Sequence, residues 1–471
     1  MAADYEVIIG LEIHVELDTQ TKLFCGCSRE YGRDPNTQIC PVCLGYPGAL
    51  PVLNQEAVHK AVLAARALGA RIHRRSYFYR KNYFYPDLPK GYQITQYTYS
   101  LAEEGALEFE FEGQKRRVRI ERMNLEEEAA KSFHTDDGYT LLDFNRSGIP
   151  LLEIVTYPDL RSPAEARTFF TRLRQLLRYL RISPCDMEKG HLRADANISV
   201  RKPGEPLGTK VELKNLNSFK ALEEGLRYEV QRQIQLLESG GRVVQETRLF
   251  DEDEGVTRPM RTKEEAHDYR YFPEPDLLPL DLDPKFLEEP LPELPDAKRE
   301  RFIRDYGLRP DVAEVLTLER ETAEYFEALI QGLTDIEQAA HWVANRVLGH
   351  LKGQAITEFP IRPEGLRELL RLVETRKITL NKAKDVFEKM LDTGKSASKI
   401  IEEEGATVIA SEDVLQTIVD EVIRENPELV EKYRKGKTGV IGPLIGQVMK
   451  KTKGSADPQV VRSLLVARLE A

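Results

Sequence analysis

Apolar and polar residues alternate along several segments of the first part of the chain, which is the pattern of half-buried β-strands. Residues 11–17 alternate Leu, Ile, Val and Leu with Glu12, His14 and Glu16. Residues 107–122 alternate around a central glycine and predict a β-hairpin. Because successive side chains of a strand point to opposite faces, the three polar residues of the first segment are expected on one face.

A second alternating segment has an unusually polar face. Residues 192–201 alternate apolar residues with arginine, aspartate, asparagine and serine, and a Pro/Gly turn at 203–208 returns the chain into 209–213. This pattern predicts an antiparallel pair of strands. A merely solvated face tends toward Lys, Glu and Thr, so short polar groups flanked by arginines favour a binding surface.

Helical spacing interrupts these strands twice. Residues 162–165 (Ser-Pro-Ala-Glu) predict a helix start with a capping box and a proline in the first turn. A second helix is expected at about 219–238, before two glycines. Seven prolines within 273–295 then predict a linker or an extended strap rather than a helix.

The chain after about residue 296 is nearly all helical in pattern, and 471 residues are too many for one ordinary domain. We therefore expect an α+β fold: a mostly antiparallel-sheet body over residues 1–292, an all-α helical domain over 293–402 and a small helical tail over 403–471. No apolar run approaches the ~18 residues of a membrane helix. No basic leader precedes the first strand, so a cytoplasmic protein is expected.

The net charge of −10 argues against nonspecific nucleic-acid binding by the chain as a whole. The average hides a basic end, because residues 431–471 hold nine Lys/Arg against three acids, a local net charge of +6. This tail is the expected place for contacts to a phosphate backbone. The residues expected to make them are Lys432, Arg434, Lys435, Lys437, Lys450, Lys451 and Lys453.

Four of the five cysteines are clustered as Cys25-x-Cys27 and Cys40-x2-Cys43. In a reducing compartment this spacing favours a metal knuckle over a set of disulfides. Four thiolates can close a tetrahedral zinc site and leave no open position, so the zinc would be structural. The alternative is a loop with four reduced cysteines.

Three further segments carry groups that suit a cation or a phosphate. Glu12 and His14 point the same way, as a divalent cation would need, although spacing alone favours the exposed polar face of a two-sided sheet. The acidic run 124–128 is normally a solvated face, but it could supply oxygen ligands for Mg²⁺ beside substrate phosphates. Residues 81–93 interleave lysines with tyrosines, which suits phosphate contact and base stacking or, equally, a structural loop packed on a sheet.

Six longer motifs occur in a fixed order along the chain. They are GLEIHVE at 10–16, KNYFYPD at 81–87, NRSGIPLLEI at 145–154, LRADANIS at 192–199, ELKNLNSF at 212–219 and DYRYFPEPD at 268–276. Together they resemble the signature runs of the tRNA-dependent amidotransferase B-subunit family. The resemblance covers essentially the whole chain, including a tail similar to the stand-alone YqeY family.

The resemblance implies a cradle-like body, shared with the archaeal amidotransferase E subunit, followed by helical parts. It implies a reaction in which ATP phosphorylates the side-chain carboxylate of misacylated Glu-tRNA(Gln) or Asp-tRNA(Asn), after which ammonia displaces phosphate. It also implies a heterotrimer with an A subunit, which releases the ammonia from glutamine, and a small C subunit. ATP and Mg²⁺ are the implied cofactors, beside the structural zinc.

The resemblance also assigns roles to residues of this chain. The expected catalytic residues are Glu12, His14, Glu126, Glu127, Asp195 and Glu212, the last two as further ligands or ammonia-steering groups. Within this set, Mg²⁺ is expected on Glu12, His14 and Glu127. The residues expected to hold phosphates are Lys81, Lys90, Arg193 and Lys214.

The acidic run differs from the family's pattern at three positions. Asn124, Glu128 and Ala130 stand where the family has histidine, aspartate and glycine, which puts Asn124 and Glu128 in doubt as direct ligands. A rival hypothesis is a noncatalytic tRNA-binding scaffold, yet clustered acids would repel a polyanion unless a cation intervened. Another is an archaeal-type E subunit, but the chain leaves no room for the additional domain of such proteins.

Overall fold

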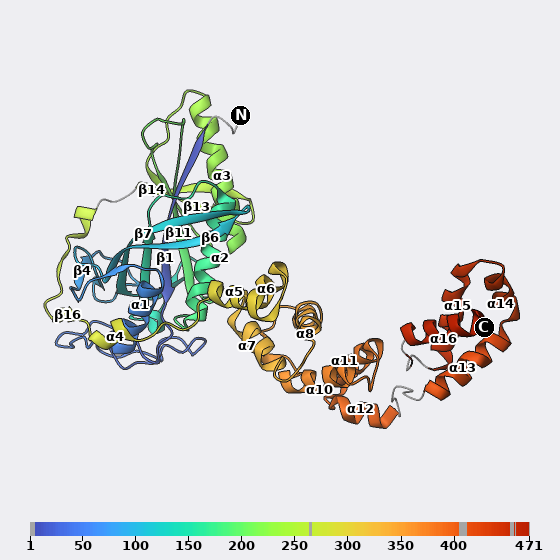
Figure 1. Ribbon diagram of the computed structural model, residues 1–471. Helices are drawn as coiled ribbons and strands as arrows, with labels where there is room; N and C mark the ends of the chain where they lie inside the picture. The colour runs from blue at the N-terminus through green and yellow to red at the C-terminus, as the bar shows by residue number, and fades with distance from the viewer. Residues whose placement is uncertain (1–4, 263–265, 405–411, 453–455, 457, 471) are drawn as a thin grey trace. The chain divides into compact units, whose positions relative to one another are not determined.

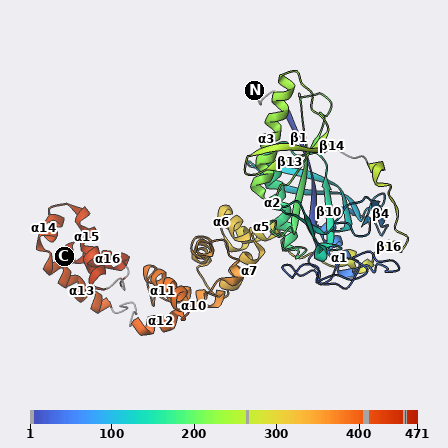
Figure 2. The ribbon, with the colours of Figure 1, turned by 180° about the vertical axis from the view of Figure 1, so that it is seen from behind.

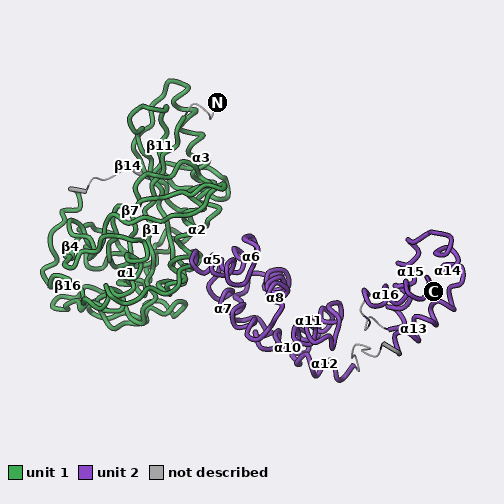
Figure 3. The backbone as a smooth tube through the Cα atoms, viewed as in Figure 1, with its two compact units in different colours: residues 1–294 green, residues 295–471 purple. Residues whose placement is uncertain are grey.

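The computed structural model describes residues 5–262, 266–404, 412–452, 456 and 458–470. The chain forms two compact units, Met1–Leu294 and Pro295–Ala471 (Figure 3). Among the described residues, every strand belongs to the first unit and the second is helical. The fold class is therefore α+β, as the sequence predicts.

A nine-stranded sheet forms the frame of the first unit, in the order β14-β13-β12-β11-β1-β10-β7-β6-β2 (Figure 1). Neighbouring strands are antiparallel except β12 and β13, which run parallel. The predicted hairpin is β6–β7, and the predicted antiparallel return is β11–β12. The strands are β1 Glu6–Glu16, β2 Arg71–Ile72, β6 Ala102–Phe111, β7 Gln114–Glu127, β10 Pro150–Thr156, β11 Leu192–Arg201, β12 Val211–Lys214, β13 Glu246–Asp251 and β14 Val256–Thr262.

Three helices pack against this sheet and share one hydrophobic core with it (Figure 2). They are α1 Gln55–Ala67, α2 Pro163–Tyr179 and α3 Phe219–Glu238. The apolar residues of β1, Leu11, Ile13 and Val15, are fully buried in this core. Burying each such side chain contributes about 1.5–3 kcal/mol. Their burial fixes β1 with its polar residues on the other face.

The predicted helix starts are present. Ser162 caps α2 by accepting a hydrogen bond from the backbone N–H of Glu165. The Glu165 carboxylate in turn accepts from the N–H of Arg161, one residue before the cap rather than at it. Ser218 caps α3 by accepting from the N–H of Ala221. These contacts satisfy N–H groups that have no partner inside the helix.

The proline-rich segment is an extended strap that returns to the body at two places. β15 (Phe272–Pro273) joins β4 (Tyr79–Asn82) and β5 (Tyr92–Thr95) in a three-stranded sheet. β16 (Leu280–Asp281) pairs with β3 (Arg75–Ser76). The expectation of no helix fails only for the short α4, Pro284–Glu288, which begins with a proline and is capped by the preceding aspartate. A separate hairpin pairs β8 (Lys131–His134) with β9 (Thr140–Asp143).

The described residues of the second unit form two separate hydrophobic cores. The first is enclosed by helices between Pro295 and Glu404, and the second by helices between Glu412 and Glu470. None of the described helices is long and apolar enough to cross a membrane. The helices are α5 Pro295–Tyr306, α6 Pro310–Thr317, α7 Arg320–Leu329, α8 Ile336–Trp342, α9 Leu348–Leu351, α10 Pro363–Glu374, α11 Leu380–Thr393, α12 Ala397–Glu404, α13 Glu412–Glu425, α14 Pro427–Arg434, α15 Ile441–Lys451 and α16 Pro458–Glu470.

Candidate functional site

The strand register gathers polar side chains on the face of the sheet that turns away from the core. His14 of β1 lies opposite Glu153 of β10 on one side and opposite Arg193 of β11 on the other. Glu12 lies opposite Asp195. Residues directly opposite each other share a face and lie close together. Four strands therefore contribute to one polar surface, because β7 continues the same row beyond β10.

Three carboxylates and one imidazole form the acid cluster, which we define as Glu12, His14, Glu126 and Glu153. Ligand atoms of Glu12, His14 and Glu153 all lie within 4.8 Å of one another. His14 Nε2 is 3.1 Å from Glu126 Oε1 and 4.0 Å from Glu12 Oε1. This donor set has the composition of a divalent-cation site.

Two neighbours hold the carboxylates of the acid cluster in place. The Asn124 amide donates a 2.8 Å hydrogen bond to Glu153 Oε2, and Thr95 Oγ1 donates one of 2.8 Å to Glu126 Oε2. Asn124 therefore acts on the cluster through Glu153. The amide oxygen of Asn124 is buried and has no hydrogen-bond partner in the part of the chain that the structure describes.

Crowding of negative charge shifts the protonation of the acid cluster. Burial would lower the pKa of His14, but its hydrogen bond to Glu126 and the nearby carboxylates raise that pKa to about 9. Burial raises the pKa of Glu153 to about 7, with Glu126 and Glu12 adding to the effect. His14 and Glu153 thus retain protons, which reduce the negative charge of the acid cluster. A bound divalent cation would neutralise this charge instead. The residues present fit a divalent ion.

Glu127 was expected in the metal set with Glu12 and His14, but the structure does not bring it there. Its side chain accepts hydrogen bonds from the Lys90 ammonium and, at 2.9 Å, from the N–H of Ile94. Glu126 and Glu127 are consecutive in β7, so their side chains point to opposite faces. Glu153 stands in the cluster in place of Glu127.

The four cysteines of the predicted knuckle come together. The Sγ atoms of Cys25, Cys27, Cys40 and Cys43 all lie within 4.8 Å of one another. The ammonium of the fully buried Lys22 is 3.5 Å from Cys43 Sγ. The pKa of the Cys43 thiol is lowered by a hydrogen bond from Cys25 and by the charge of Lys22. Four sulfur donors, one already favoured as thiolate, can hold a metal ion with no coordination position left open.

Asp195 and Glu212, expected as catalytic groups, lie beside the acid cluster and share a lysine. Lys214 Nζ donates a hydrogen bond to Asp195 Oδ2 and lies 3.8 Å from Glu212 Oε1. Burial would lower the pKa of Lys214, but the two carboxylates raise it. Glu212 also accepts a 3.0 Å hydrogen bond from Thr247. The expected phosphate-binding Lys214 is therefore held between two acids.

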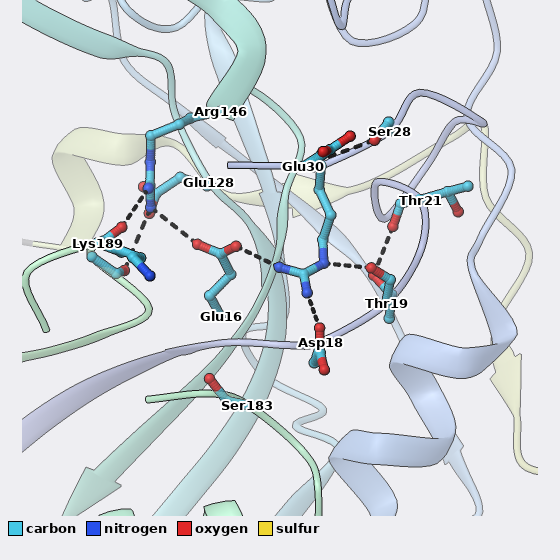
Figure 4. A network of polar contacts seen from close by, with 12 residues as sticks. Glu16, Asp18, Thr19, Thr21, Ser28, Glu30, Glu128, Arg146, Ser183 and Lys189 are labelled. Atoms are coloured by element: carbon cyan, nitrogen blue, oxygen red, sulfur yellow. Dashed lines mark hydrogen bonds and ion pairs between the residues drawn. The ribbon is translucent and has the colours of Figure 1, made fainter. Parts of the chain in front are cut away.

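A chain of arginines and glutamates continues the polar surface past the end of β1 (Figure 4). Arg146 Nη2 lies 3.3 Å from both Glu16 Oε2 and Glu128 Oε2, and Arg29 binds the other oxygen of Glu16 at 2.7 Å. Arg193, expected on phosphate, forms an ion pair with Glu128. Burial would raise the pKa of Glu128, but Arg193 and Arg146 lower it. Arg146 lies in the motif at 145–154, but no pattern singled it out, and Arg29 lies in none of the six motifs.

The remaining expected residues are spread over two regions. Lys81 Nζ lies 4.7 Å from the centre of the Tyr269 ring and, among the described residues, has no carboxylate partner. In the tail, Lys435 pairs with Glu431, and Lys451 pairs with glutamates of α13. Helix α14 contains Lys432 and Arg434, helix α15 contains Lys450, and Lys437 lies in the segment between these helices. Lys453 lies outside the described residues.

Comparison with known protein families gives a match over each of two long ranges of the chain. Residues 7–288 match the GatB/GatE catalytic domain family, and residues 324–469 match the GatB domain family. The chain is 50% identical over 476 aligned residues to a protein of Carboxydothermus hydrogenoformans that is named as the B subunit of an aspartyl/glutamyl-tRNA(Asn/Gln) amidotransferase, covering 99% of each chain. It is 51% identical to the protein of that name in Caldanaerobacter subterraneus subsp. tengcongensis, covering 98% of each.

A third relative with the same name, from Thermodesulfovibrio yellowstonii, is 49% identical, and the match covers 98% of each chain. Identity of about one half along nearly the whole of each chain leaves no part of the body, the helical middle or the tail outside the match. The chain belongs to the B-subunit family of the aspartyl/glutamyl-tRNA(Asn/Gln) amidotransferases.

Proposed function

We propose that this chain is the B subunit of a glutamine-dependent tRNA amidotransferase and that it activates a tRNA-linked carboxylate with ATP. The observation that carries the proposal is the acid cluster, held on the polar face of the sheet in a member of this family. We assign the catalytic cradle to residues 1–292, a helical domain to 293–402 and a tRNA-binding tail to 403–471.

The proposed reaction has two steps. A side-chain carboxylate oxygen of Glu-tRNA(Gln) or Asp-tRNA(Asn) attacks the γ-phosphorus of ATP, which gives an acyl phosphate and ADP. Ammonia then attacks the acyl carbon, phosphate leaves, and one proton is released as the amide forms. The protein's part in phosphoryl transfer is positioning and charge neutralisation, with little covalent work.

Glu12, His14, Glu126 and Glu153 would hold Mg²⁺, which neutralises charge on a transferring phosphoryl group. Thr95 and Asn124 keep two of these carboxylates oriented through their hydrogen bonds. Because the ligands come from three neighbouring strands, their spacing is set by the sheet rather than by loops. This rigidity suits a step that depends on placement.

Neighbouring cations would bind phosphate groups, and a neighbouring acid would accept the proton that ammonium releases. Lys81, without a carboxylate partner among the described residues, is the cation best able to bind an incoming phosphate. Arg193, Lys90 and Lys214 carry acid partners that a phosphate would have to displace. Asp195, which lies beside the cluster and accepts a hydrogen bond from Lys214, would take the proton that ammonium must lose before ammonia can attack.

The proposal extends to partners and metals. A second subunit must release ammonia from glutamine, and a third, small subunit would complete a cytoplasmic heterotrimer. The basic residues of α14 and α15 would contact the tRNA backbone. Zinc on the four cysteines would serve only to hold the knuckle.

A noncatalytic scaffold is the second candidate, because a binding module also needs basic groups. Against it stands the acid cluster, since clustered carboxylates would repel a tRNA unless a cation intervened. A scaffold gives no account of why these acids are crowded enough to retain protons.

The deciding experiment is transfer of the γ-phosphate of labelled ATP to Glu-tRNA(Gln) by the assembled enzyme. Wild type should form the labelled acyl phosphate, and Glu153→Gln should form at least about 100-fold less of it while tRNA affinity is retained. Glu108→Gln, an exposed glutamate of β6, is the matched control and should behave as wild type. Equal labelling by wild type and Glu153→Gln would favour the scaffold.

A further inference from the structure

The loop that joins the two cysteine pairs is hydrogen-bonded to a turn of the first unit far away in the sequence. We define the knuckle loop as residues 25–43 and the clamped turn as residues 142–148. The Asn36 side chain donates a hydrogen bond of 3.0 Å to the carbonyl of Leu142 and accepts one of 2.8 Å from the N–H of Phe144. The φ of Asn36 is +58°, in the left-handed region that asparagine tolerates better than most residues. Asparagine thus fits this position by its backbone and by its side chain.

A second asparagine makes the reciprocal contact from the clamped turn. Asn145 Nδ2 donates to the carbonyl of Asp34, and Asn145 Oδ1 accepts from the N–H of Gln38, each at 2.8 Å. Beside the cysteines, Ser147 Oγ donates a hydrogen bond of 3.1 Å to the carbonyl of Cys43. Both the middle and the end of the knuckle loop are therefore fastened to the clamped turn.

The clamped turn carries Arg146, which belongs to a row of ion pairs beside the acid cluster. Two arginines share one oxygen of Glu128: Arg193 pairs with Oε2, and Arg146 Nη2 lies 3.3 Å from the same atom (Figure 4). Arg193 lies opposite His14 in the register of β1 with β11. The Arg193 side chain is 48% exposed, whereas those of Arg146 and Glu128 are only 18% and 11% exposed. A phosphate would therefore reach Arg193 and leave Arg146 on the carboxylate.

This sharing allows Glu128 to change partners. If Arg193 turned to a phosphate with no substitute in place, the Glu128 carboxylate would be left buried and unpaired, which is strongly destabilising. Arg146 is the substitute, because it already contacts the same oxygen. Arg146 also contacts Glu16, whose other oxygen is bound at 2.7 Å by Arg29 of the knuckle loop. The knuckle loop thus supports this row of ion pairs twice, through the clamped turn and through Arg29.

We propose that the knuckle loop positions Arg146 to take over Glu128 when Arg193 binds a phosphate of ATP. Asn36 and Asn145 are positioning residues for Arg146, because their side chains fasten the loop to the turn that carries it. This inference rests on the proposed function, in which ATP supplies the phosphate. A metal ion that fixes the four cysteines would also fix the loop that holds this turn.

The test measures how tightly the assembled enzyme, with Mg²⁺ present, binds a nonhydrolysable analogue of ATP. Asn36→Gly removes both side-chain hydrogen bonds without backbone strain, because glycine also adopts a positive φ. It should weaken binding of the analogue about 3- to 10-fold, the effect of one net hydrogen bond, while zinc content and Mn²⁺ affinity stay as in wild type. Asn36→Asp, which keeps the acceptor for the N–H of Phe144, should recover part of the affinity.

Thr37→Ala is the matched control. It removes a hydrogen bond of 2.6 Å to the carbonyl of Asp34, which lies inside the knuckle loop and does not reach the clamped turn. This variant should bind the ATP analogue as wild type does.

A double-mutant cycle separates positioning from folding. Arg146→Met removes the substitute partner but leaves Glu128 paired with Arg193 and Glu16 paired with Arg29. It should weaken binding of the analogue at least as much as Asn36→Gly. Adding Asn36→Gly to Arg146→Met should cause no further loss, because its effect passes through Arg146.

Wild-type affinity in either single variant, or losses that multiply in the double variant, would overturn the proposal. So would loss of zinc in Asn36→Gly, since the asparagine would then serve only to keep the knuckle loop folded. If binding of the analogue changes as expected but labelled acyl phosphate never forms, the proposed function fails and the positioning of Arg146 stands.

Discussion

At the scale of single residues, the site depends on which way two consecutive glutamates point. Glu126 faces His14, whereas Glu127 faces Lys90. Glu126→Gln and Glu153→Gln should each weaken binding of Mn²⁺, as a spectroscopic probe for Mg²⁺, by at least about tenfold. Titration of the full chain, followed by the electron spin resonance of free Mn²⁺, measures this directly.

Glu127→Gln is the matched control for the Mn²⁺ titration. It removes a carboxylate from the same strand as Glu126, so cation affinity should stay unchanged while thermal stability falls, because Lys90 loses its partner in a largely buried setting. A loss of Mn²⁺ affinity in Glu127→Gln as large as in Glu153→Gln would contradict the opposite orientations of the two glutamates.

The sequence predicted part of this cluster and missed the rest for a physical reason. Glu12 and His14 stand in a recognisable motif, and Glu126 stands in the acidic run 124–128. Glu153 also lies in a motif, but its place opposite His14 follows from the register of β1 with β10, two strands separated by more than 100 residues. The acidic run gave no sign of which of its glutamates faces the cluster, since that depends on the register of β7 as well. Lys22 and Arg146 are likewise brought in by long-range packing.

At the scale of elements, the sequence predicted well those strands and helices whose formation depends on residues close together in the chain. Alternation identified β1, β6–β7 and β11–β12, and capping residues identified α2 and α3. The proline-rich segment was predicted as extended, but its pairing with β3 and β4 was not, because proline content limits backbone angles without choosing a partner strand. The stacking of Tyr97 on Tyr271 depends on that pairing, so the sequence alone could not predict it.

The connection after β10 is anchored to β7 by one ion pair whose strength should depend on pH. Asp159 accepts hydrogen bonds of 2.8 and 2.7 Å from the Arg119 guanidinium and one of 3.0 Å from its backbone N–H. These bonds hold the pKa of Asp159 below its usual value despite partial burial. A lowered folded-state pKa means that the stabilisation is present above the unfolded pKa, ~3.9, and is lost as pH falls through the folded one.

Asp159→Asn should therefore lower the free energy of unfolding at pH 7 by about 0.5–1 kcal/mol. The effect is modest because Arg119 is more than half exposed and solvent screens the pair. The difference from wild type should begin to shrink as pH falls below ~3.9 and be smaller at pH 3 than at pH 7, as urea unfolding of both proteins at the two pH values would measure. A difference that stays constant down to pH 3 would mean that the loss comes from packing and not from charge.

At the scale of the whole molecule, the chain keeps its proposed chemistry and its proposed RNA-backbone contacts in parts with separate cores. The acid cluster rests on the core of the sheet and of α1, α2 and α3, whereas the basic helices α14 and α15 surround a core of their own. Removing the tail should therefore leave the first unit folded. Deleting the tail should therefore separate the proposed chemistry of the first unit from the proposed RNA-backbone contacts of the tail. Substitutions could not separate the two if both depended on one core.

Deleting residues 405–471 is the cleanest form of this test, because it keeps α12 whole, including the ion pairs of Glu404 with Lys382 and Lys389. The shortened chain should bind Mn²⁺ as the full chain does, but bind tRNA at least about tenfold more weakly at low salt, with a log affinity–log salt slope reduced by one or more. Each lost phosphate contact lowers the number of counterions that binding releases. The tRNA affinities of the full and the shortened chain should therefore converge as salt rises. Unchanged tRNA affinity at every salt concentration would show that the tail's charge serves another partner, and the RNA contacts would then have to lie on the first unit or on the helices between Pro295 and Glu404.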